Sequence, residues 1–376
     1  MPKLIRSSKP FFPQEDINPL LSDIGKVLEN GQFRFGKNVE IFEDQTASYL
    51  GVDGAVAFDS DSSAYETALR FFGVEGKEVV VCTNSFISVP NSVLFAGGKV
   101  VFADIKADSL SMDPDSLESH LSPDTRGVII THIAGFPNPD LQRIQEICRD
   151  RGLFLIEDAT HAIGGSVFGK KVGGFGDAAV FSFTPTKVIT TGEGGMLVSS
   201  DAELREFAKR YSFYGSGSGK TNFVNVGRHM VMAEISALLG IYQLKRLDEF
   251  VERRNKIAKA YDQAFKKIKQ LKTVDCPDGT LSAYYKYPLI LDRDIDRQQF
   301  AKALIEEYGV ETGNIFYPPC HMQGAYRSSG GFSQGDLSVA EDVLSRTIAL
   351  PVHMELSDED VAFVINKVES FTRRLS

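Results

Sequence analysis

Residues 153–196 read LFLIEDATHAIGGSVFGKKVGGFGDAAVFSFTPTKVITTGEGGM and combine two short apolar runs with the polar side chains that follow them. The first run, 153–156, is followed by two carboxylates, of which Asp158 is the second. The second run, Ala179–Phe183, is followed by hydroxyl side chains and then by Lys187. Short runs that are apolar throughout are typical of strands buried on both faces of a parallel sheet. We therefore expect Asp158 and Lys187 at the carboxyl edge of such a sheet, where open α/β folds bind ligands.

The same pattern extends toward the N-terminus. There, apolar runs alternate with segments whose apolar residues recur every three or four positions. We expect strands at Val79–Cys82, Val100–Ala103, Val128–Thr131, Phe154–Ile156 and Ala179–Phe183, and helices at Ser63–Phe72, Ser88–Phe95 and Asp140–Arg151. Strands separated by helices predict an α/β fold with a mostly parallel sheet covered on both faces.

The pattern changes after the Gly/Ser-rich stretch Gly215–Gly219. Here we expect one long helix over Met232–Phe265, a strand over Ala283–Leu291, and helices over Arg297–Tyr308 and Asp358–Thr372. We place a domain boundary near residue 250, which divides the chain into a large domain (1–250) with an N-terminal segment and a smaller domain (251–376).

Composition excludes several classes of protein. The 376 residues are 43% hydrophobic and 24% charged, as in an ordinary folded protein, and the net charge of −9 argues against a nucleic-acid partner. The chain has neither a run of 18 apolar residues nor a secretory signal pattern, so we expect no membrane span and a cytoplasmic location. The four cysteines lie far apart and the six histidines show no metal-ligand spacing, which predicts free thiols and no metal site.

Asp158 and Lys187 at neighbouring strand ends suit a site for pyridoxal phosphate (PLP). Lysine forms Schiff bases with carbonyl compounds when its pKa is lowered. A carboxylate can keep the ring nitrogen of the cofactor protonated, so that the ring accepts electrons. Both residue types are also common in ordinary turns and loops, and spacing alone leaves these two interpretations open.

Five motifs resemble those of the DegT/DnrJ/EryC1/StrS aminotransferases, PLP enzymes that aminate keto sugars. The motifs are SFTPTKVITTGEGG (182–195), GQFRFGKNVEIFEDQTASYLGV (31–52), VVVCTNSFISVPNSVLFAGGKVVFADI (79–105), MAEISALLGIYQLKRLDEFVERR (232–254) and FYPPCHMQ (316–323). The resemblance implies an aspartate-aminotransferase-like fold (PLP fold type I), with a large α/β/α domain and a smaller C-terminal α+β domain. It also implies a homodimer that transfers an amino group from glutamate or glutamine to a nucleotide-linked keto sugar in amino sugar biosynthesis, by a ping-pong mechanism.

The resemblance assigns a role to each matching residue. Lys187 matches the lysine that carries the cofactor as a Schiff base and shuttles protons, and Asp158 matches the carboxylate on the pyridine nitrogen. His161 lies where the family has His or Gln beside the ring. Phe86 matches the aromatic residue that stacks on the ring, and Ser182 matches a side chain that binds the phosphate.

Three departures from the family pattern affect the rest of the site. Ser62 and Ser63 match the phosphate cup at a helix start, but the family's Ser-Gly-Thr is replaced here by a triplet with Asp61 at its centre. We expect Asp61 to point away from the phosphate, because like charges at 4 Å repel by about 1 kcal/mol even in water.

The other departures lie near residue 230. His229 replaces the family's Asn, which reaches the partner subunit's phosphate, and Val231 replaces a basic residue. Arg228 is a candidate to replace this basic residue in binding the second substrate. His321, in the motif FYPPCHMQ (316–323), is expected near the substrate entrance.

Other interpretations stay open. A PLP-dependent dehydratase, an aminotransferase for a carbocycle such as an inosose, and a non-catalytic regulatory member of the family would all share this scaffold. The motifs do not identify the sugar, the nucleotide, or the position and stereochemistry of amination. Residues 215–221 imitate a nucleotide phosphate loop, but Tyr214 stands where that pattern requires glycine, and the stretch follows a helix where a strand is required.

Overall fold

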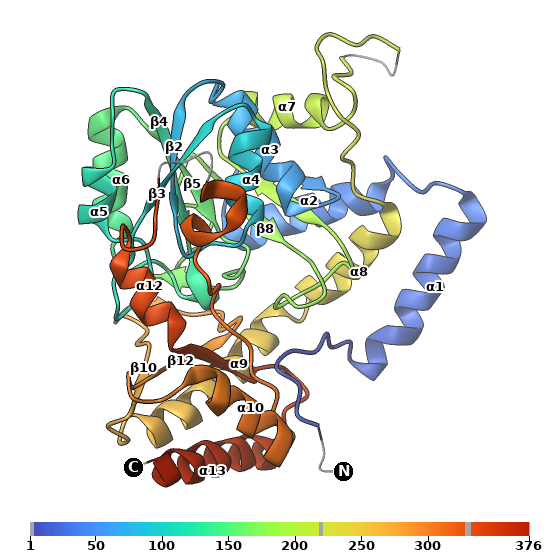
Figure 1. Ribbon diagram of the computed structural model, residues 1–376. Coiled ribbons are helices and arrows are strands. Elements are labelled where there is room, and N and C mark those ends of the chain that lie inside the picture. The colour runs from blue at the N-terminus through green and yellow to red at the C-terminus, as the bar shows by residue number, and fades with distance from the viewer. Residues whose placement is uncertain (1–3, 218–220, 328–331, 376) are drawn as a thin grey trace.

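The computed structural model describes residues 4–217, 221–327 and 332–375 (Figure 1). A large body is built around one long sheet, and a smaller body with its own sheet lies below it in Figure 1. Residues 218–220, inside the Gly/Ser-rich stretch that imitates a phosphate loop, lie outside the described residues. Within the described ranges, no helix is both long and apolar enough to cross a membrane.

The large sheet has seven strands among the described residues, in the order β1-β9-β8-β5-β4-β2-β3. Their bounds are β1 (Ala55–Phe58), β2 (Glu78–Cys82), β3 (Lys99–Ala103), β4 (Thr125–Thr131), β5 (Phe154–Asp158), β8 (Ala178–Ser182) and β9 (Gly195–Val198). The run from β3 to β8 is parallel, whereas β9 is antiparallel to both of its neighbours. The predicted α/β fold with a mostly parallel sheet is confirmed.

Both faces of this sheet are covered, which explains why its strands are apolar throughout. Successive side chains of a strand point to opposite faces. Val79 and Val81 of β2 therefore belong to the apolar cluster of α3, α4 and α7, whereas Val80 and Cys82 belong to that of α5 and α6. Helices α2 and α8 cover the other half of this second face. The helix bounds are α2 (Lys37–Leu50), α3 (Asp61–Phe71), α4 (Ser88–Phe95), α5 (Pro114–Ser119), α6 (Leu141–Arg151), α7 (Ala202–Tyr211) and α8 (Glu234–Leu244).

The smaller body contains a three-stranded antiparallel sheet, in the order β10-β12-β13, within the described part of the chain. Its elements are β10 (Leu271–Thr273), β12 (Tyr287–Leu291), β13 (Thr347–Leu350), α9 (Leu247–Phe265), α10 (Arg297–Tyr308), α12 (Ser338–Ser345) and α13 (Asp358–Leu375). The N-terminal segment joins this body, because Ile5 forms a parallel bridge with Val310. The boundary near residue 250 stays a prediction.

The remaining elements are short or lie at the edges. Helix α1 (Gln14–Asn30) projects at the right of Figure 1. The others are β6 (Ser166–Val167), β7 (Lys170–Lys171), β11 (Thr280–Leu281), α11 (Gly324–Arg327) and the 3₁₀ turns η1 (Ile133–Gly135) and η2 (Cys320–Met322).

The prediction of one long helix over Met232–Phe265 is wrong. Helix α8 ends at Leu244 and α9 begins at Leu247. Between them Arg246 donates hydrogen bonds to Asp16 of α1 at 2.8 and 3.0 Å, and α8 packs on α2 while α9 continues toward the small sheet. The apolar spacing continues across the break, so the spacing alone could not report the change of direction.

The predicted strand over Ala283–Leu291 is too long, since β12 begins only at Tyr287. The preceding residues turn toward η1 instead of pairing with a strand. Ala283 donates its N–H to the carbonyl of Gly135 at 3.0 Å, and Lys286 donates to that of Ala134 at 3.1 Å. This course brings the side chains of residues 284–286 to the carboxyl edge of the large sheet.

Candidate active site

Asp158 is the last residue of β5, and its carboxylate is buried at the carboxyl edge of the sheet. Thr131, at the end of the neighbouring strand β4, donates its hydroxyl to Asp158 Oδ2 at 3.0 Å. The backbone N–H of Thr160 donates to Oδ1 at 3.2 Å. These two bonds fix the direction of the carboxylate at the edge of the sheet.

Lys187 lies five residues beyond the end of β8, the strand next to β5. Its Nζ is 4.9 Å from the ring centre of Tyr285, whose hydroxyl lies 3.1 Å from Thr186 Oγ1. Burial lowers the pKa of Lys187 to about 8, while the carboxylates of Asp158 and Asp61 oppose this shift. A fraction of the amine is therefore neutral at neutral pH, as a nucleophile requires.

His161 forms one wall of the space around Lys187. Its ring stacks on Tyr285 with centroids 4.3 Å apart, and on Phe316 with centroids 5.4 Å apart. Burial, with a further effect of Lys187, holds the pKa of His161 well below its usual range, so the imidazole is neutral. Its Nδ1 atom is buried and makes no hydrogen bond within the described residues. Phe86, half exposed, has its ring centre 5.6 Å from that of Phe316.

The start of α3 is held by its own hydroxyl groups. Ser60 is the N-cap and accepts a hydrogen bond from the N–H of Ser63 at 3.2 Å. The Ser63 hydroxyl donates to Asp59 Oδ1 at 2.6 Å. Since both donors of Ser63 are engaged in this cap, its predicted role in binding phosphate is not supported by the geometry, and Ser62 is the better candidate.

Asp61 does not point away from the site, contrary to expectation. Ser88 of α4 donates its hydroxyl to Asp61 Oδ2 at 3.3 Å, and the N–H of Ser62 donates to the same carboxylate. Burial raises the pKa of Asp61, and the nearby ammonium of Lys187 opposes this. A carboxylate of the chain itself thus lies at the helix N-terminus, where an anion is favoured.

Ser182 ends β8 beside this helix start. Its hydroxyl oxygen is buried without a hydrogen-bond partner among the described residues. Ser182 pairs across the sheet with Gly195, at which a Cβ would lie 2.4 Å from the carbonyl carbon of Ser60. A glycine is therefore required here for the strand to approach the start of α3.

The donor set fits PLP at the ring and departs from it at the phosphate. Asp158 can hold a protonated ring nitrogen and Lys187 can hold the aldehyde. His161 Nδ1 and Ser182 Oγ, which make no hydrogen bond among the described residues, can bind polar groups of the cofactor. Asp61 does not suit a phosphate site, because its carboxylate would repel the phosphate. In the described part of the chain, no group of three His, Cys, Asp or Glu side chains could hold a metal ion.

Two predicted residues lie outside this cluster. His229 is exposed, and its Nε2 lies 3.1 Å from Nη1 of Arg34, which belongs to the N-terminal part of the chain. Arg228 forms an ion pair with Glu66 of α3, with Nε and Oε1 3.0 Å apart. Among the described residues, neither His229 nor Arg228 forms a contact with Lys187 of the same chain.

His321 is fully buried, which argues against the predicted contact with substrate. Its Nδ1 lies 2.7 Å from the hydroxyl of Thr83, and its Nε2 lies 3.1 Å from Oε1 of Glu341. With both ring nitrogens engaged, His321 ties the end of β2 to α12. This bond supports the segment that carries Phe86.

Glu157, beside Asp158, forms a buried support for the strand end. Asn138 donates its N–H to Nδ1 of His132, which leaves the Nε2 proton of His132 to donate to Glu157 at 3.0 Å. Glu157 also accepts hydrogen bonds from the N–H groups of Gly173 and Gly176, at 2.9 and 2.8 Å. A fully satisfied buried network of this kind keeps Asp158 in place.

Three residues of the site were not predicted from the sequence. Tyr285, Lys286 and Phe316 come from the C-terminal third of the chain and face His161 and Lys187. The one signal that could have found Lys286 is a lysine inside the run AYYKYPLIL, which is otherwise free of charge.

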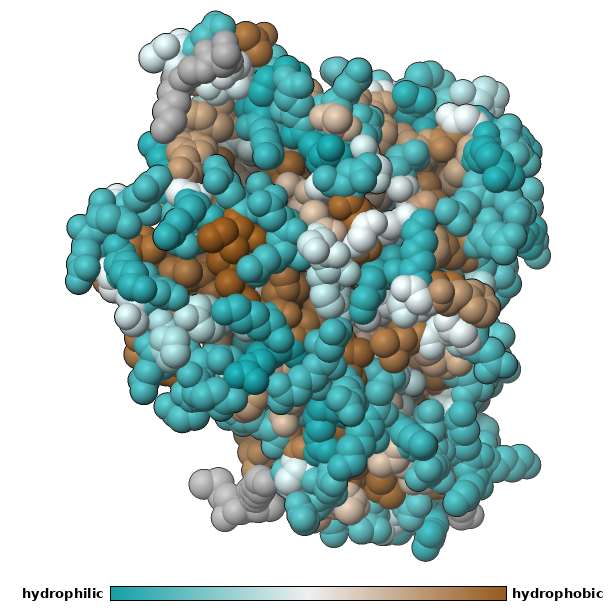
Figure 2. All heavy atoms as spheres, turned by 180° about the vertical axis from the view of Figure 1, so that it is seen from behind, coloured by the Kyte–Doolittle hydropathy of each residue, from teal (hydrophilic) through white to brown (hydrophobic). Residues whose placement is uncertain are grey.

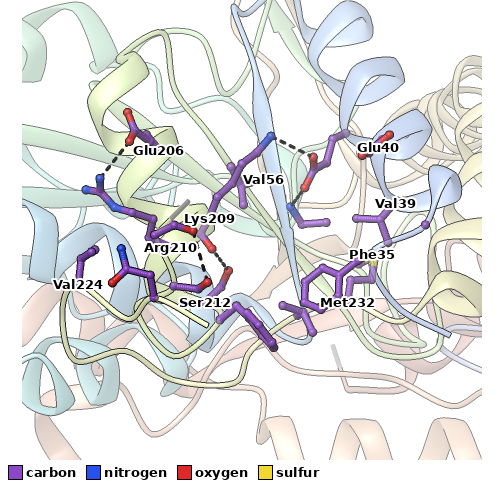
Figure 3. Close-up of a pocket in the computed structure, with 18 residues that line it drawn as sticks. Phe35, Val39, Glu40, Val56, Glu206, Lys209, Arg210, Ser212, Val224 and Met232 are labelled. Atoms are coloured by element: carbon purple, nitrogen blue, oxygen red, sulfur yellow. Dashed lines mark hydrogen bonds and ion pairs between the residues drawn. The ribbon is translucent and has the colours of Figure 1, made fainter. Parts of the chain in front are cut away.

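A separate cavity of about 780 Å³ lies between α2, α7 and residues of the segments 212–217 and 222–232 (Figure 3). Phe35, Val39 and Met232 form an apolar part of its wall, and Lys209 reaches toward a carboxylate on α2. That carboxylate belongs to Glu43, whose oxygens accept a hydrogen bond from Ala57 N–H at 2.8 Å and lie 3.8 Å from Lys209 Nζ. Asp158 and Lys187 do not line this cavity.

Replacing Glu43 by Gln is expected to stabilise the protein at pH 8 but not at pH 5. Burial raises the pKa of Glu43 to about 7, only partly opposed by the hydrogen bond from Ala57 and by Lys209. Because the folded pKa is raised, stability is lost as the pH rises through 7. The variant should therefore gain about 2–3 kcal/mol at pH 8. Urea unfolding at both pH values measures this, with the exposed Glu40→Gln as control, and an equal effect at both pH values would refute it.

The fold and the facing lysine and carboxylate define an enzyme of the aspartate-aminotransferase type. A family model described as the DegT/DnrJ/EryC1/StrS aminotransferase family matches residues 15–369. The chain belongs to this family and is an aminotransferase, as the sequence motifs predicted.

The relatives agree with this assignment. The spore coat polysaccharide biosynthesis protein SpsC of Bacillus subtilis is 33% identical, over 97% of this chain and 96% of its own. The dTDP-4-dehydro-2,3,6-trideoxy-D-glucose 4-aminotransferase of Saccharopolyspora spinosa is 31% identical, over 97% and 96%. The solved structure of Helicobacter pylori PseC, an aminotransferase involved in the biosynthesis of pseudoaminic acid, is 29% identical with a TM-score of 0.92 over 99% of this chain and 100% of that one.

Proposed function

We propose that the protein is a PLP-dependent aminotransferase that moves an amino group from glutamate or glutamine to a nucleotide-linked keto sugar by a ping-pong mechanism. The observation that carries the proposal is the buried Asp158 beside Lys187, whose pKa is lowered to about 8 by burial. The relative from Saccharopolyspora spinosa is named for a nucleotide-linked keto sugar, which supports this class of acceptor.

Each residue of the cluster has a defined task in this proposal. PLP, when bound, supplies an electron sink that stabilises negative charge on the substrate carbon. Lys187 holds the cofactor aldehyde and then moves the proton at the substrate carbon, a general acid–base step within hydrogen-bond reach. Asp158 keeps the ring nitrogen protonated, Phe86 covers the ring, and the free Nδ1 of His161 offers a hydrogen bond to a ring substituent.

We assign the phosphate to Ser182 and Ser62. The carboxylate of Asp61, which has the same sign of charge as a phosphate, lies nearby. The unpaired hydroxyl of Ser182 and the nearby N-terminus of α3 both favour an anion. Protonation of Asp61 would remove the conflict, and the buried position of its carboxylate favours the neutral form. Cofactor affinity should therefore depend on this one residue.

Replacing Asp61 by Asn is expected to tighten binding of the cofactor phosphate by about tenfold. Repulsion between unit charges at 4 Å is about 1 kcal/mol in water and about 4 kcal/mol near a protein surface. The ligand is pyridoxine 5′-phosphate, which lacks the aldehyde, and binding is measured by calorimetry, so that Lys187 does not contribute. Because burial raises the pKa of Asp61, the difference from wild type should shrink as the pH falls. The exposed Asp53→Asn serves as control, and equal affinities for wild type and Asp61→Asn would exclude the effect.

We also propose a homodimer in which His229 serves the partner's cofactor. His229 is exposed and remote from Lys187 of its own chain, as a residue that acts across an interface should be. Figure 2 shows an apolar area next to α1, at the left, and Phe33, Phe35 and Leu28 are exposed in this part of the chain. Contiguous exposed apolar surface marks interaction sites. Arg228, whose side chain is 54% exposed, stays the candidate for contact with the sugar nucleotide.

A cytoplasmic location completes the proposal. Cys82, Cys148, Cys276 and Cys320 are all free, which suits a reducing compartment.

The proposed reaction is tested with purified protein, glutamate or glutamine, and a panel of nucleotide-linked keto sugars. Mass spectrometry should show one amino sugar formed for each oxo acid released from the donor. A dehydratase would consume the keto sugar without converting the donor amino acid, and a regulatory protein would change neither. Either of these results would overturn the proposed transfer.

A further inference from the structure

Lys286 is a cation at the edge of the active site. Its Nζ donates a hydrogen bond to the carbonyl oxygen of Asn314 at 2.8 Å. In the described ranges of the chain, no Asp or Glu oxygen forms an ion pair with it. Burial, with the nearby ammonium of Lys187, lowers its pKa to about 8. A cation in such a place is stabilised when an anion joins it.

Lys286 and the reacting Lys187 lie close to the same aromatic side chain. Its Nζ lies 5.4 Å from the ring centre of Tyr285 and 5.3 Å from that of Phe316. Lys187 Nζ lies 4.9 Å from the same Tyr285 ring centre, and His161 stacks on both aromatic rings. The two lysines thus share one aromatic wall, which holds Lys286 in position.

A small cavity opens at this point. It has a volume of about 170 Å³ and is lined by Thr186, Tyr285, Lys286, Gly313 and the N-terminal residues Ser7 and Ser8. Pockets for drug-sized molecules span about 300–1,000 Å³, so this one suits one end of an amino acid and not a nucleotide. Its polar lining consists of hydroxyl groups and the ammonium, all of which can donate hydrogen bonds to an anion.

We propose that Lys286 binds the α-carboxylate of the amino-acid donor. The inference rests on the proposed function, because it assigns the donor's place in that same site. An α-amino group is separated from its carboxylate by a single carbon, so a carboxylate at Lys286 places the amine on the side of Lys187. An amine that lacks an α-carboxylate has no group that can pair with the Lys286 ammonium. Lys286 therefore favours α-amino acids as donors.

The test compares Lys286→Met with wild type, using glutamate and 4-aminobutyrate, which is glutamate without its α-carboxylate. Half-reactions are followed by the loss of the yellow band of the lysine-bound cofactor. Lys286→Met should raise the KM for glutamate about 10- to 100-fold, as expected for losing a hydrogen bond to a charged group, and leave 4-aminobutyrate unaffected. Calorimetric titration with glutarate, which has no amine, should show a similar loss of affinity. Lys286→Arg should restore much of both, and the exposed Lys245→Met should behave as wild type.

Failure of this inference differs from failure of the proposed function. If wild-type protein shows no yellow band, or if neither amine removes it, the proposed function is wrong and the inference falls with it. If wild type reacts but Lys286→Met keeps its affinity for glutarate and its preference for glutamate, only the inference is wrong. Loss of the yellow band in Lys286→Met would also overturn it, because Lys286 would then support Lys187 and not the donor.

Discussion

Replacement of Lys187 by alanine is expected to abolish both the yellow absorption band and turnover. The variant loses the amine that holds the cofactor aldehyde and the group that moves the proton, and general acid–base catalysis alone contributes about 10²–10⁴-fold. We expect turnover to fall by about 10⁴-fold or more. The fold should be unchanged, because among the described residues the Nζ of Lys187 forms no ion pair within 4 Å that the variant would break.

The pH dependence of cofactor capture adds a second readout for Lys187. Burial lowers the pKa of Lys187 to about 8, so the neutral amine becomes more abundant as the pH rises through 8 and levels off only well above it. The rate at which the wild-type protein gains the yellow band should follow this curve. The exposed Lys302→Ala is the matched control. Turnover by Lys187→Ala near the wild-type rate would show that another group does the chemistry.

Replacement of Asp158 by Asn is expected to lower turnover by about 10²–10³-fold, the usual effect of removing one preorganised charge from an active site. The amide keeps the size of the side chain. Its oxygen can still accept the hydrogen bond that Thr131 donates to Asp158 Oδ2 at 3.0 Å in the wild type. It cannot keep a ring nitrogen protonated. The loss should therefore fall on the rate of the chemical step, while cofactor still binds.

Single-turnover kinetics with glutamate distinguish these effects, because they separate the chemical step from binding. Thermal unfolding of Asp158→Asn checks that the buried site has not collapsed. The exposed Asp150→Asn at the end of α6 is the control. A normal chemical step in Asp158→Asn would mean that Asp158 is only structural, held there by Thr131 and Thr160.

Much of the large sheet could be predicted because its strands are short, apolar throughout and separated by amphipathic helices. Asp158 ends one such strand and Lys187 lies five residues beyond the end of its neighbour, and neighbouring parallel strands bring their carboxyl ends together. Local sequence is sufficient here, since the pairing of β5 with β8 follows from the fold class.

Other features depend on contacts between distant segments. The break between α8 and α9 lies where Arg246 meets α1, about 230 residues earlier in the chain. Lys286 reaches the site because residues 283–286 bond to η1, and Tyr285 lies beside Thr186, 99 residues away. Propensity and periodicity report neither of these contacts.

The direction of single side chains is the least predictable part. Asp61 was expected to avoid the site, but Ser88 and the charge of Lys187 hold it inside. His321 was expected at the substrate entrance, but Thr83 and Glu341 engage both of its nitrogens. In both cases the partner residues belong to other elements, so the motif alone could not decide.

The most direct test of the proposed function is the visible absorption spectrum of the purified protein with added PLP, recorded before and after addition of glutamate or glutamine. A yellow band that forms with PLP and disappears with one of these donors is the predicted result, since it requires Lys187 to hold the cofactor and the donor to release it. A wild-type protein that forms no band, or whose band survives both donors, would contradict the proposed amino transfer.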